Sequence, residues 1–357
     1  MAEGRRVMIT GVAGDLAGLF AAALEARDDV AHVVGVDIRT PSVPLQRTEF
    51  VRADVRNPVV ARVLEQQDID TVVHMSTSSS PTASGGRALM KEHNVIGAMQ
   101  LLAACQKTPS VRRFVLKSTA AVYGSEHTDP VSFRETDQPR TPPPHGFAKD
   151  ATEIEGYVRA FGQRRGDVDV TILRFANFVG GRVDSVFSRL FGLPAVPTVL
   201  GYDPRLQFCH EDDAVEVLGR VTCGRHPGVY NVAGDGVVYL SQAIRLAGRV
   251  PAPVPRPFVD GVAGWLYRNR RIDVSPEQLR FLQFGRAIDT TRLREDLGYQ
   301  PRYSSRAAFE DFVRRRRIRG LVAHDEVRRL EHEVNAFLAR HDQRRFLAGQ
   351  SVSEDRS

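Results

Sequence analysis

A glycine-rich turn near the start of the chain has the residue types and spacing needed to hold a phosphate group. The segment Gly11-Val12-Ala13-Gly14-Asp15-Leu16-Ala17 follows a short apolar run and opens an amphipathic stretch. Its first two glycines let the backbone curl tightly and approach a diphosphate, which would rest on amide groups at the N-terminus of the next helix. The residues of this turn predicted to contact the bound ligand are Gly11, Ala13, Gly14, Asp15 and Leu16.

An acidic residue follows at the distance that a dinucleotide-binding unit requires. Asp37 ends the predicted strand His32–Val36 and is placed to accept hydrogen bonds from the hydroxyls of an adenosine ribose. A carboxylate there would repel the 2′-phosphate of NADP, so the pattern favours NAD. Arg39 is also predicted to lie at this site, and its positive charge leaves NADP as an alternative cofactor. The alternative role for Asp37 is that of a solvent-exposed turn residue.

The elements that must position these residues alternate between strand and helix. Apolar runs separated by stretches with helical spacing predict a parallel sheet with right-handed crossovers. The expected fold is an α/β, Rossmann-type doubly wound sheet with a smaller α/β substrate-binding part at the C-terminal side. Strands are predicted at 5–9, 32–36, 71–73, 114–116 and 170–173, and helices at 16–26, 59–65, 87–106 and 147–161.

Proline clusters and a less regular pattern mark the second half of the chain. We assign residues 1–175 and about 206–235 to an NAD-binding domain, and about 176–205 and 236–312 to a substrate-binding part. Residues 313–357 form a basic, amphipathic helical tail. Its arginines, Arg314 to Arg317, lack interleaved aromatic residues, so a solvated face or an acidic partner is favoured over nucleic acid or a lipid surface.

Composition sets the broad class of protein. The chain has 357 residues, 42% of them hydrophobic, which suits one large domain with a smaller appended part. The absence of a long apolar run and of a signal peptide predicts a soluble, cytoplasmic protein without a membrane span. The net charge of +6 is carried by arginine, with lysine only at four positions, and arginine suits phosphate-bearing ligands. Cys105, Cys209 and Cys223 stand too far apart in sequence to predict a metal site.

Several motifs, in order, resemble those of a known family. They are Ala53-Asp54-Val55-Arg56, Val72-Val73-His74-Met75-Ser76, Asn94-Val95-Ile96-Gly97, Ser118-Thr119-Ala120-Ala121-Val122-Tyr123-Gly124 and Arg174-Phe175-Ala176-Asn177. From about Val7 to Phe312 the chain resembles the extended short-chain dehydrogenases/reductases, the NAD-dependent epimerase/dehydratase group that acts on nucleotide sugars. It is similar to actinobacterial members of the UDP-glucose 4-epimerase-like type.

The resemblance implies roles for individual residues. Asp54 and Val55 would lie near the adenine, and Met75, Ser76 and Thr77 near the nicotinamide ribose. The predicted substrate contacts are Thr119, Asn177 and Arg205. Asn94 is included in the predicted catalytic set, whereas His210 and Asp213 are expected to be structural.

The family's chemistry requires a hydroxyl donor, a tyrosine and a lysine, and one of the three is missing here. Thr119 fits the donor and Lys149 the lysine, for which the alternative is a solvated surface residue. The tyrosine position, four residues before the lysine, is His145. Histidine has a suitable pKa for a base but reaches roughly 2 Å less far. Tyr123 is the other candidate for the proton acceptor, and its alternative role is that of an aromatic packing residue.

Two hypotheses follow for the whole chain. The first is an NAD-dependent nucleotide-sugar epimerase or oxidoreductase that transiently oxidises a sugar carbon. A dehydratase is less favoured, because Ala120 and Ala121 stand where that type has an acid pair. The second is a non-catalytic protein that binds NAD or a sugar nucleotide. The family resemblance implies a homodimer, and no nucleic-acid partner is expected.

Overall fold

A parallel seven-stranded sheet forms the centre of the molecule. The computed structural model describes residues 4–80, 84–139, 143, 146–259, 261 and 281–318. The strand order is β3-β2-β1-β4-β5-β6-β11, and neighbouring strands run parallel. The strands are β1 (Arg5–Thr10), β2 (Val30–Asp37), β3 (Thr48–Arg52), β4 (Thr71–His74), β5 (Arg113–Thr119), β6 (Asp169–Phe175) and β11 (Gly228–Val232).

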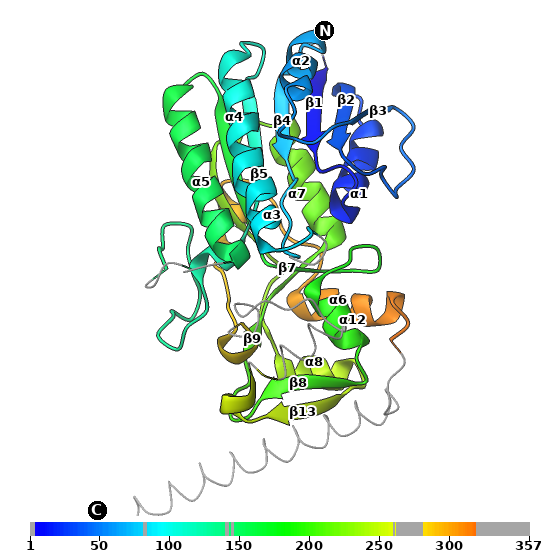
Figure 1. Cartoon of the computed structure of the whole chain (residues 1–357). Coiled ribbons are helices and arrows are strands. Elements are labelled where there is room, and N and C mark those ends of the chain that lie inside the picture. The colour runs from blue at the N-terminus through cyan, green and yellow to red at the C-terminus, as the bar shows by residue number, and fades with distance from the viewer. Residues whose placement is uncertain are drawn as a thin grey trace, which may run out of the picture.

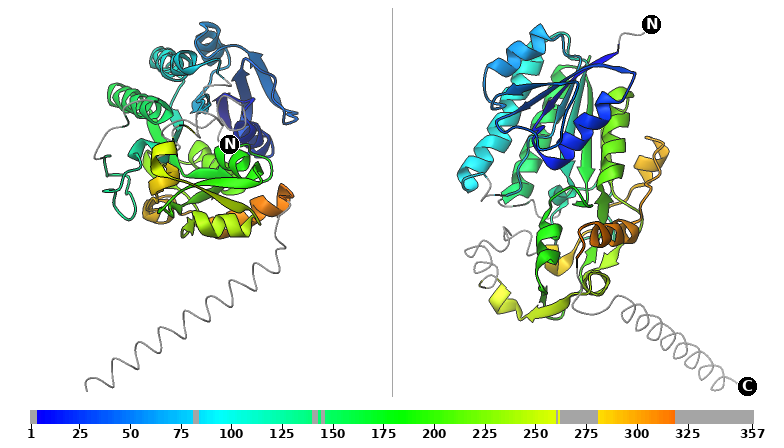
Figure 2. Two further views of the ribbon diagram at one scale, coloured as in Figure 1. Left: turned by 60° about the horizontal axis from the view of Figure 1, so that its bottom comes forward. Right: turned by 90° about the vertical axis from the view of Figure 1, so that its right-hand side faces the viewer.

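Helices cover both faces of this sheet, as Figures 1 and 2 show. Alternating side chains of β1 divide between the two layers: Val7 and Ile9 belong to the core beneath α1 and α7, and Met8 to the core beneath α2, α4 and α5. These helices are α1 (Asp15–Glu25), α2 (Val59–Gln66), α4 (Gly97–Lys107), α5 (Gly146–Arg164) and α7 (Glu211–Cys223). The short helix α3 (Arg87–Lys91) joins α4 through a π-helical turn, Glu92–Ile96.

The sheet order places a ligand crevice at a defined point. From β1 the chain builds outward through β2 and β3, and then returns to add β4 on the other side of β1. In such sheets ligands bind outside the carboxyl ends of the strands where the order reverses. The predicted doubly wound Rossmann-type sheet with a smaller C-terminal part is therefore confirmed.

The smaller part lies beyond the carboxyl ends of the sheet strands (Figure 1). Its core is aromatic, with Phe187, Phe208 and Phe309 buried together. Its elements are β7 (Asn177–Val179), α6 (Val186–Gly192), β8 (Ala195–Val199), β9 (Arg205–Leu206), β10 (Phe208–His210), β12 (Val238–Tyr239), α8 (Leu240–Leu246), β13 (Val250–Val254), a 3-10 turn (Arg256–Phe258) and α12 (Ser305–Arg315). Helix α11 (Thr291–Glu295) instead packs on β11, and its Leu293 is buried in the core beneath α1 and α7.

The start of the predicted basic tail packs on this part of the fold. Helix α12 runs through Arg315, and both Arg314 and Arg315 pair with the buried carboxylate of Asp311. Arg316 donates a hydrogen bond to the carbonyl of Val183. Residues 319–357 lie outside the described part of the chain. Among the described helices, none has the length and apolar character needed to cross a membrane.

Candidate functional site

The glycine turn between β1 and α1 leaves no room for larger residues. Gly11 has φ +77°, and a Cβ atom there would lie 2.7 Å from the backbone N and Cα of Ser76. The Gly14 amide donates to the Gly11 carbonyl at 3.0 Å, which closes the turn, and Gly14 then caps α1. The turn therefore presents the N-terminus of α1 to the crevice, as an anion site requires.

Asp37 holds this turn from the end of β2. One carboxylate oxygen accepts from the Ala13 amide at 3.1 Å and the other from the Arg39 amide at 3.0 Å. Each carboxylate oxygen can accept a further bond, so the side chain can still receive two ribose hydroxyls. Arg39 itself is exposed. The structure thus places Asp37 at the glycine turn, and its role as the ribose-binding acid stays a prediction.

Replacing Asp37 should change the choice of dinucleotide. Hydrogen bonds to a carboxylate contribute about 1.5–3 kcal/mol, so we expect Asp37→Ala to weaken NAD binding by roughly tenfold or more. The ratio of the affinity for NAD to the affinity for NADP should fall as well. Isothermal titration with both dinucleotides measures this, with the exposed Asp28→Ala as the matched control. Tighter binding of NADP than of NAD by the unmodified chain would contradict the assignment of Asp37.

Asp54, which is predicted to lie near the adenine, already forms hydrogen bonds within the protein. Asp54 accepts hydrogen bonds from the Arg56 guanidinium, which hold the pKa of that carboxyl below its usual range. Val55 is 4% exposed and packs in the core of the α4 face. Val55 can therefore offer a ligand little more than its backbone.

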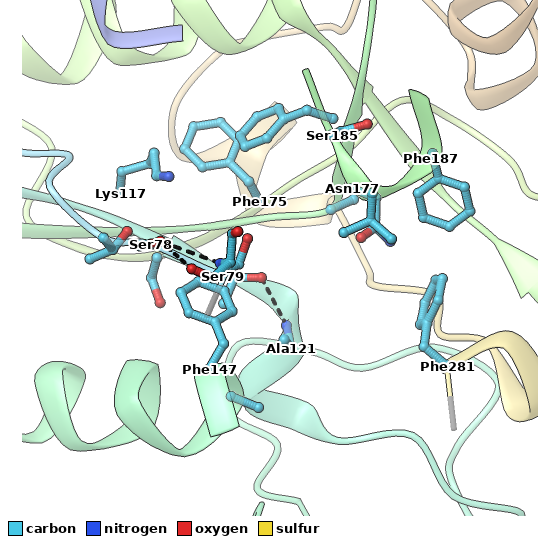
Figure 3. A pocket seen from close by; sticks show the side chains of 18 of the residues that line it. Ser78, Ser79, Lys117, Ala121, Phe147, Phe175, Asn177, Ser185, Phe187 and Phe281 are labelled. Atoms are coloured by element: carbon cyan, nitrogen blue, oxygen red, sulfur yellow. Dashed lines mark hydrogen bonds between the residues drawn. The ribbon is translucent and has the colours of Figure 1, made fainter. Parts of the chain in front are cut away.

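One cavity joins the glycine turn to the substrate-binding part. Its volume is about 400 Å³, within the range of small-molecule sites. Figure 3 shows side chains from several elements around it. Eight of the predicted site residues line it: Gly11, Gly14, Asp15, Leu16, Met75, Thr77, Thr119 and Asn177.

Thr119 is oriented by the turn that follows β5. Its Oγ1 accepts from the Ala121 amide at 3.1 Å and so caps a 3-10 helix over Ala120–Tyr123. Because this bond uses the oxygen as an acceptor, the hydroxyl hydrogen remains available to a ligand oxygen. Thr119 can therefore act as the predicted hydroxyl donor.

The other predicted catalytic residues lie around the cavity or beyond the described ranges. Lys149 is half-buried in the first turn of α5; its neighbours Phe147 and Ala148 line the cavity, and Lys149 is not among the lining residues. His145 lies outside the residues that the structure describes. The roles of Lys149 and His145 therefore stay predictions.

Asn94 has a positioning role in the structure. It is fully buried, its side-chain oxygen accepts from the Ser78 amide, and its amide group donates to the Ser78 carbonyl and to Asp150. Asp150 in turn pairs with Arg87, which also donates to the carbonyl of Gly146. This network fixes the loop after β4 against the start of α5, on both sides of the cavity.

Tyr123 is not a proton acceptor of this cavity. Its hydroxyl donates to Asn231 at 2.8 Å and accepts from Arg174 at 2.8 Å, and its ring stacks on Phe133. The side chain is 1% exposed, and burial raises the pKa of its hydroxyl. The packing role that the sequence offered as an alternative is the one the structure supports.

Two further predictions concern residues outside the cavity. His210 caps α7 and contacts Asp311, and Asp213 accepts from the Tyr299 hydroxyl, so both are structural as expected. Arg205 lies in β9, where its carbonyl accepts from the Arg286 amide, and its side chain does not line the cavity. The three cysteines also lie outside the lining.

The cavity contains three cations that the sequence analysis did not predict as site residues. Arg189 of α6 and Arg286 lie toward the substrate-binding part, where guanidinium groups suit a diphosphate. Arg286 donates to the Gly124 carbonyl and to Ser125, and burial lowers its pKa to about 10. The third cation is Lys117 of β5, which shares the cavity with the glycine turn.

Comparisons with known proteins agree with this fold. The uncharacterized protein Rv0501 of Mycobacterium tuberculosis is 46% identical over 329 residues, which cover 91% of this chain and 88% of the relative. Among solved structures, UDP-glucose 4-epimerase from Thermotoga maritima with UDP-glucose is similar in fold at 19% identity and a TM-score of 0.68, covering 87% of this chain and 98% of that chain. UDP-glucuronic acid 4-epimerase from Bacillus cereus in complex with NAD matches at 20% identity and a TM-score of 0.67, with coverage of 87% and 98%.

The family follows from a match over most of the described sheet. Residues 7–233 match the model of the NAD dependent epimerase/dehydratase family, which includes β1, the glycine turn, Thr119 and β11. The chain belongs to the NAD dependent epimerase/dehydratase family.

Proposed function

We propose that this chain is an NAD-dependent enzyme of nucleotide-sugar metabolism, of the UDP-sugar 4-epimerase type. The observation that carries this proposal is the continuity of one cavity from Gly11 and Gly14, through Thr119, to Asn177 and Arg286. A dinucleotide at one end and a sugar diphosphate at the other would bring a sugar carbon and a nicotinamide ring together over Thr119. One solved structure of similar fold holds UDP-glucose and NAD in one complex.

The residues present fit the dinucleotide. At Gly11 a Cβ atom would fill the space beside the backbone that a diphosphate needs. Asp37 can accept hydrogen bonds from ribose hydroxyls, and Met75 and Thr77 line the cavity beside the glycine turn. When bound, NAD supplies a reversible hydride acceptor. The chain's own part is to hold the diphosphate on the α1 N-terminus and the sugar hydroxyl on Thr119, and to exclude water.

A sugar nucleotide suits the opposite end of the cavity. Arg189 and Arg286 provide guanidinium groups for its diphosphate, and Asn177 provides an amide that can both donate and accept. The hydroxyl-bearing residues Ser78 and Ser79 line the wall between the two ends (Figure 3). Alternating hydroxyl donors and acceptors are what a sugar ring requires.

A binding protein without turnover is the second candidate function. The specific observation that favours it is the histidine at position 145, where the family's tyrosine is expected. Phosphate and ribose binding need Gly11, Gly14 and Asp37, and they do not need that tyrosine. A homodimer is also part of the proposal and rests on the family alone.

The two candidates differ in product formation. We expect the purified protein to convert UDP-glucose slowly to UDP-galactose, His145→Tyr to raise the rate at least tenfold, and His145→Ala to lower it, because general acid–base groups contribute 10²–10⁴-fold. Chromatography of the sugar nucleotides measures this, with Lys107→Met as a surface control. No interconversion by any of these proteins, while NAD stays bound, would favour the binding protein.

A further inference from the structure

Lys117 occupies a position that strand β5 would ordinarily give to an apolar residue. Side chains alternate along the strand, so Lys117 faces the same side as Val115 and Thr119. Val115 is fully buried in the core beneath α1 and α7, and Thr119 lines the cavity. Lys117 lies between them, where the core opens into the cavity, and Figure 3 shows its nitrogen directed inward.

The surroundings of Lys117 are mainly apolar. Its nitrogen lies 5.9 Å from the ring centroid of Phe178, and Met75 and Phe175 line the same wall. Within the described ranges no carboxylate forms an ion pair with it, and burial lowers its pKa to about 8. The titratable and charged groups on the elements around it are His74 of β4, Asp15 of α1, Glu126, Asp184, Arg189 and Arg286.

Among these groups, His74 does not compensate the charge of Lys117. Its Nδ1 lies 2.7 Å from the Thr10 hydroxyl, and burial lowers the pKa of His74 to about 3, so the ring is neutral. Two acids of the cavity accept hydrogen bonds from other residues: Asp15 accepts from the Asp184 amide, and Asp184 accepts from Ser188. A ligand that binds beside Lys117 can therefore change the protonation state of its amine.

The sheet order indicates which half of a dinucleotide that ligand would be. A diphosphate at the glycine turn after β1 and an adenosine ribose on Asp37 would occupy β1 and β2, on one side of the switch point. The remaining half of the dinucleotide would extend to the other side, over β4 and β5. Lys117 and Thr119 of β5 are therefore the residues that would face the nicotinamide ring.

We propose that Lys117 binds a proton in step with the oxidation state of the dinucleotide: a neutral amine beside the oxidised, positively charged ring, and an ammonium beside the reduced, neutral ring. This inference rests on the proposed function. Its physical basis is repulsion between like charges at short range in a poorly solvated pocket. Oxidation of a sugar CH–OH to C=O releases one hydride and one proton. The bound dinucleotide would supply the hydride acceptor. The amine of Lys117 would hold the proton, which leaves the sugar hydroxyl through the acid–base residue at position 145.

The proposal predicts different pH profiles for the two forms of the cofactor. Below the pKa of Lys117 the oxidised ring must displace a proton in order to bind, whereas the reduced ring need not. We expect the affinity for NAD⁺ to fall by up to about tenfold from pH 9 to pH 7, and the affinity for NADH to change little. Isothermal titration of ligand-free full-length protein with each form measures both.

Two substitutions bracket the charge of this side chain. Lys117→Met removes it, so NAD⁺ should bind at pH 7 as tightly as the unmodified protein binds it at pH 9. Lys117→Arg keeps a permanent cation, so binding of NAD⁺ should stay weak throughout this pH range. NADH binding reports correct folding of both variants. Lys107→Met, at the exposed end of α4, should retain the unmodified profile.

The outcomes separate this inference from the proposed function. Equal pH profiles for NAD⁺ and NADH, or an unmodified profile in Lys117→Met, would overturn the role of Lys117 and leave NAD binding intact. A protein that binds neither form at any pH would contradict the proposed function and this inference together.

Discussion

Gly11→Ala should abolish dinucleotide binding, with an affinity loss of about 100-fold or more. The new Cβ would lie 2.7 Å from backbone atoms of Ser76, which cannot yield as a side chain would, and φ at this position is +77°. The turn must therefore open, which moves the amides of the α1 N-terminus away from the diphosphate. Titration with NAD and NADH measures the loss.

Gly201→Ala is the matched control for this substitution. Gly201 also has a positive φ, +86°, but a Cβ there meets no atom within 4 Å, and the residue lies outside the cavity. It should show the backbone cost of about 1–2 kcal/mol in stability and unchanged NAD binding. Unimpaired NAD binding by Gly11→Ala would show that the diphosphate does not lie on this turn.

Arg174→Met should destabilise the protein by up to about 3–5 kcal/mol, because it leaves the buried carboxylate of Glu155 without its buried partner and paired with Arg159, which is 43% exposed. The Arg174 guanidinium donates to both oxygens of Glu155, at 3.0 and 2.7 Å, and to the Tyr123 hydroxyl. Arg174 and Glu155 are 3% and 1% exposed. Ser118, next to Thr119, donates to the same carboxylate, so the network also supports the end of β5.

An exposed ion pair provides the comparison for this prediction. Arg112 and Asp167 lie 2.8 Å apart with side chains 60% and 43% exposed, so Arg112→Met should change stability by about 0.5 kcal/mol or less. Denaturant unfolding followed by circular dichroism measures both variants. Similar unfolding midpoints for Arg174→Met and the unmodified protein would mean that the buried pair contributes no net stability.

The features predictable from sequence are those encoded by neighbouring residues. The glycine turn, the strand before it and Asp37 at the end of the next strand lie within one βαβ unit, and the structure brings Asp37 onto the amide of Ala13. Helix α5 was expected over 147–161 and extends over Gly146–Arg164. Periodicity was sufficient in these cases, because buried faces determine both the element and its orientation.

The missed cations depend on contacts between distant segments. Arg286 donates a hydrogen bond to the carbonyl of Gly124, which lies 162 positions earlier in the chain. Nothing in the sequence around Arg286 distinguishes it from the other arginines of this arginine-rich chain. Arg205, which was predicted as a substrate contact, instead meets the Arg286 backbone. Sequence reasoning proposed arginine as the residue type for a diphosphate, and it could not select which arginines line the cavity.

Lys117 did carry a signal in the sequence. It follows the apolar run Phe114-Val115-Leu116 and shares its strand face with Val115, so alternation alone places a charge on a buried face. It is also one of only four lysines in the chain. Burying a charge on the inner face of a central strand costs free energy unless the charge interacts with a ligand. This rule identifies Lys117 as a candidate site residue.

The most direct test of the account is hydride transfer itself. Ligand-free protein is loaded with NAD⁺ and mixed with UDP-glucose, and the absorbance of NADH is followed over a single turnover. We predict a transient rise in NADH that decays as UDP-galactose forms, and loss of the signal in Gly11→Ala. Tight binding of both ligands with no NADH and no second epimer would contradict the enzyme and leave a binding protein on the same fold.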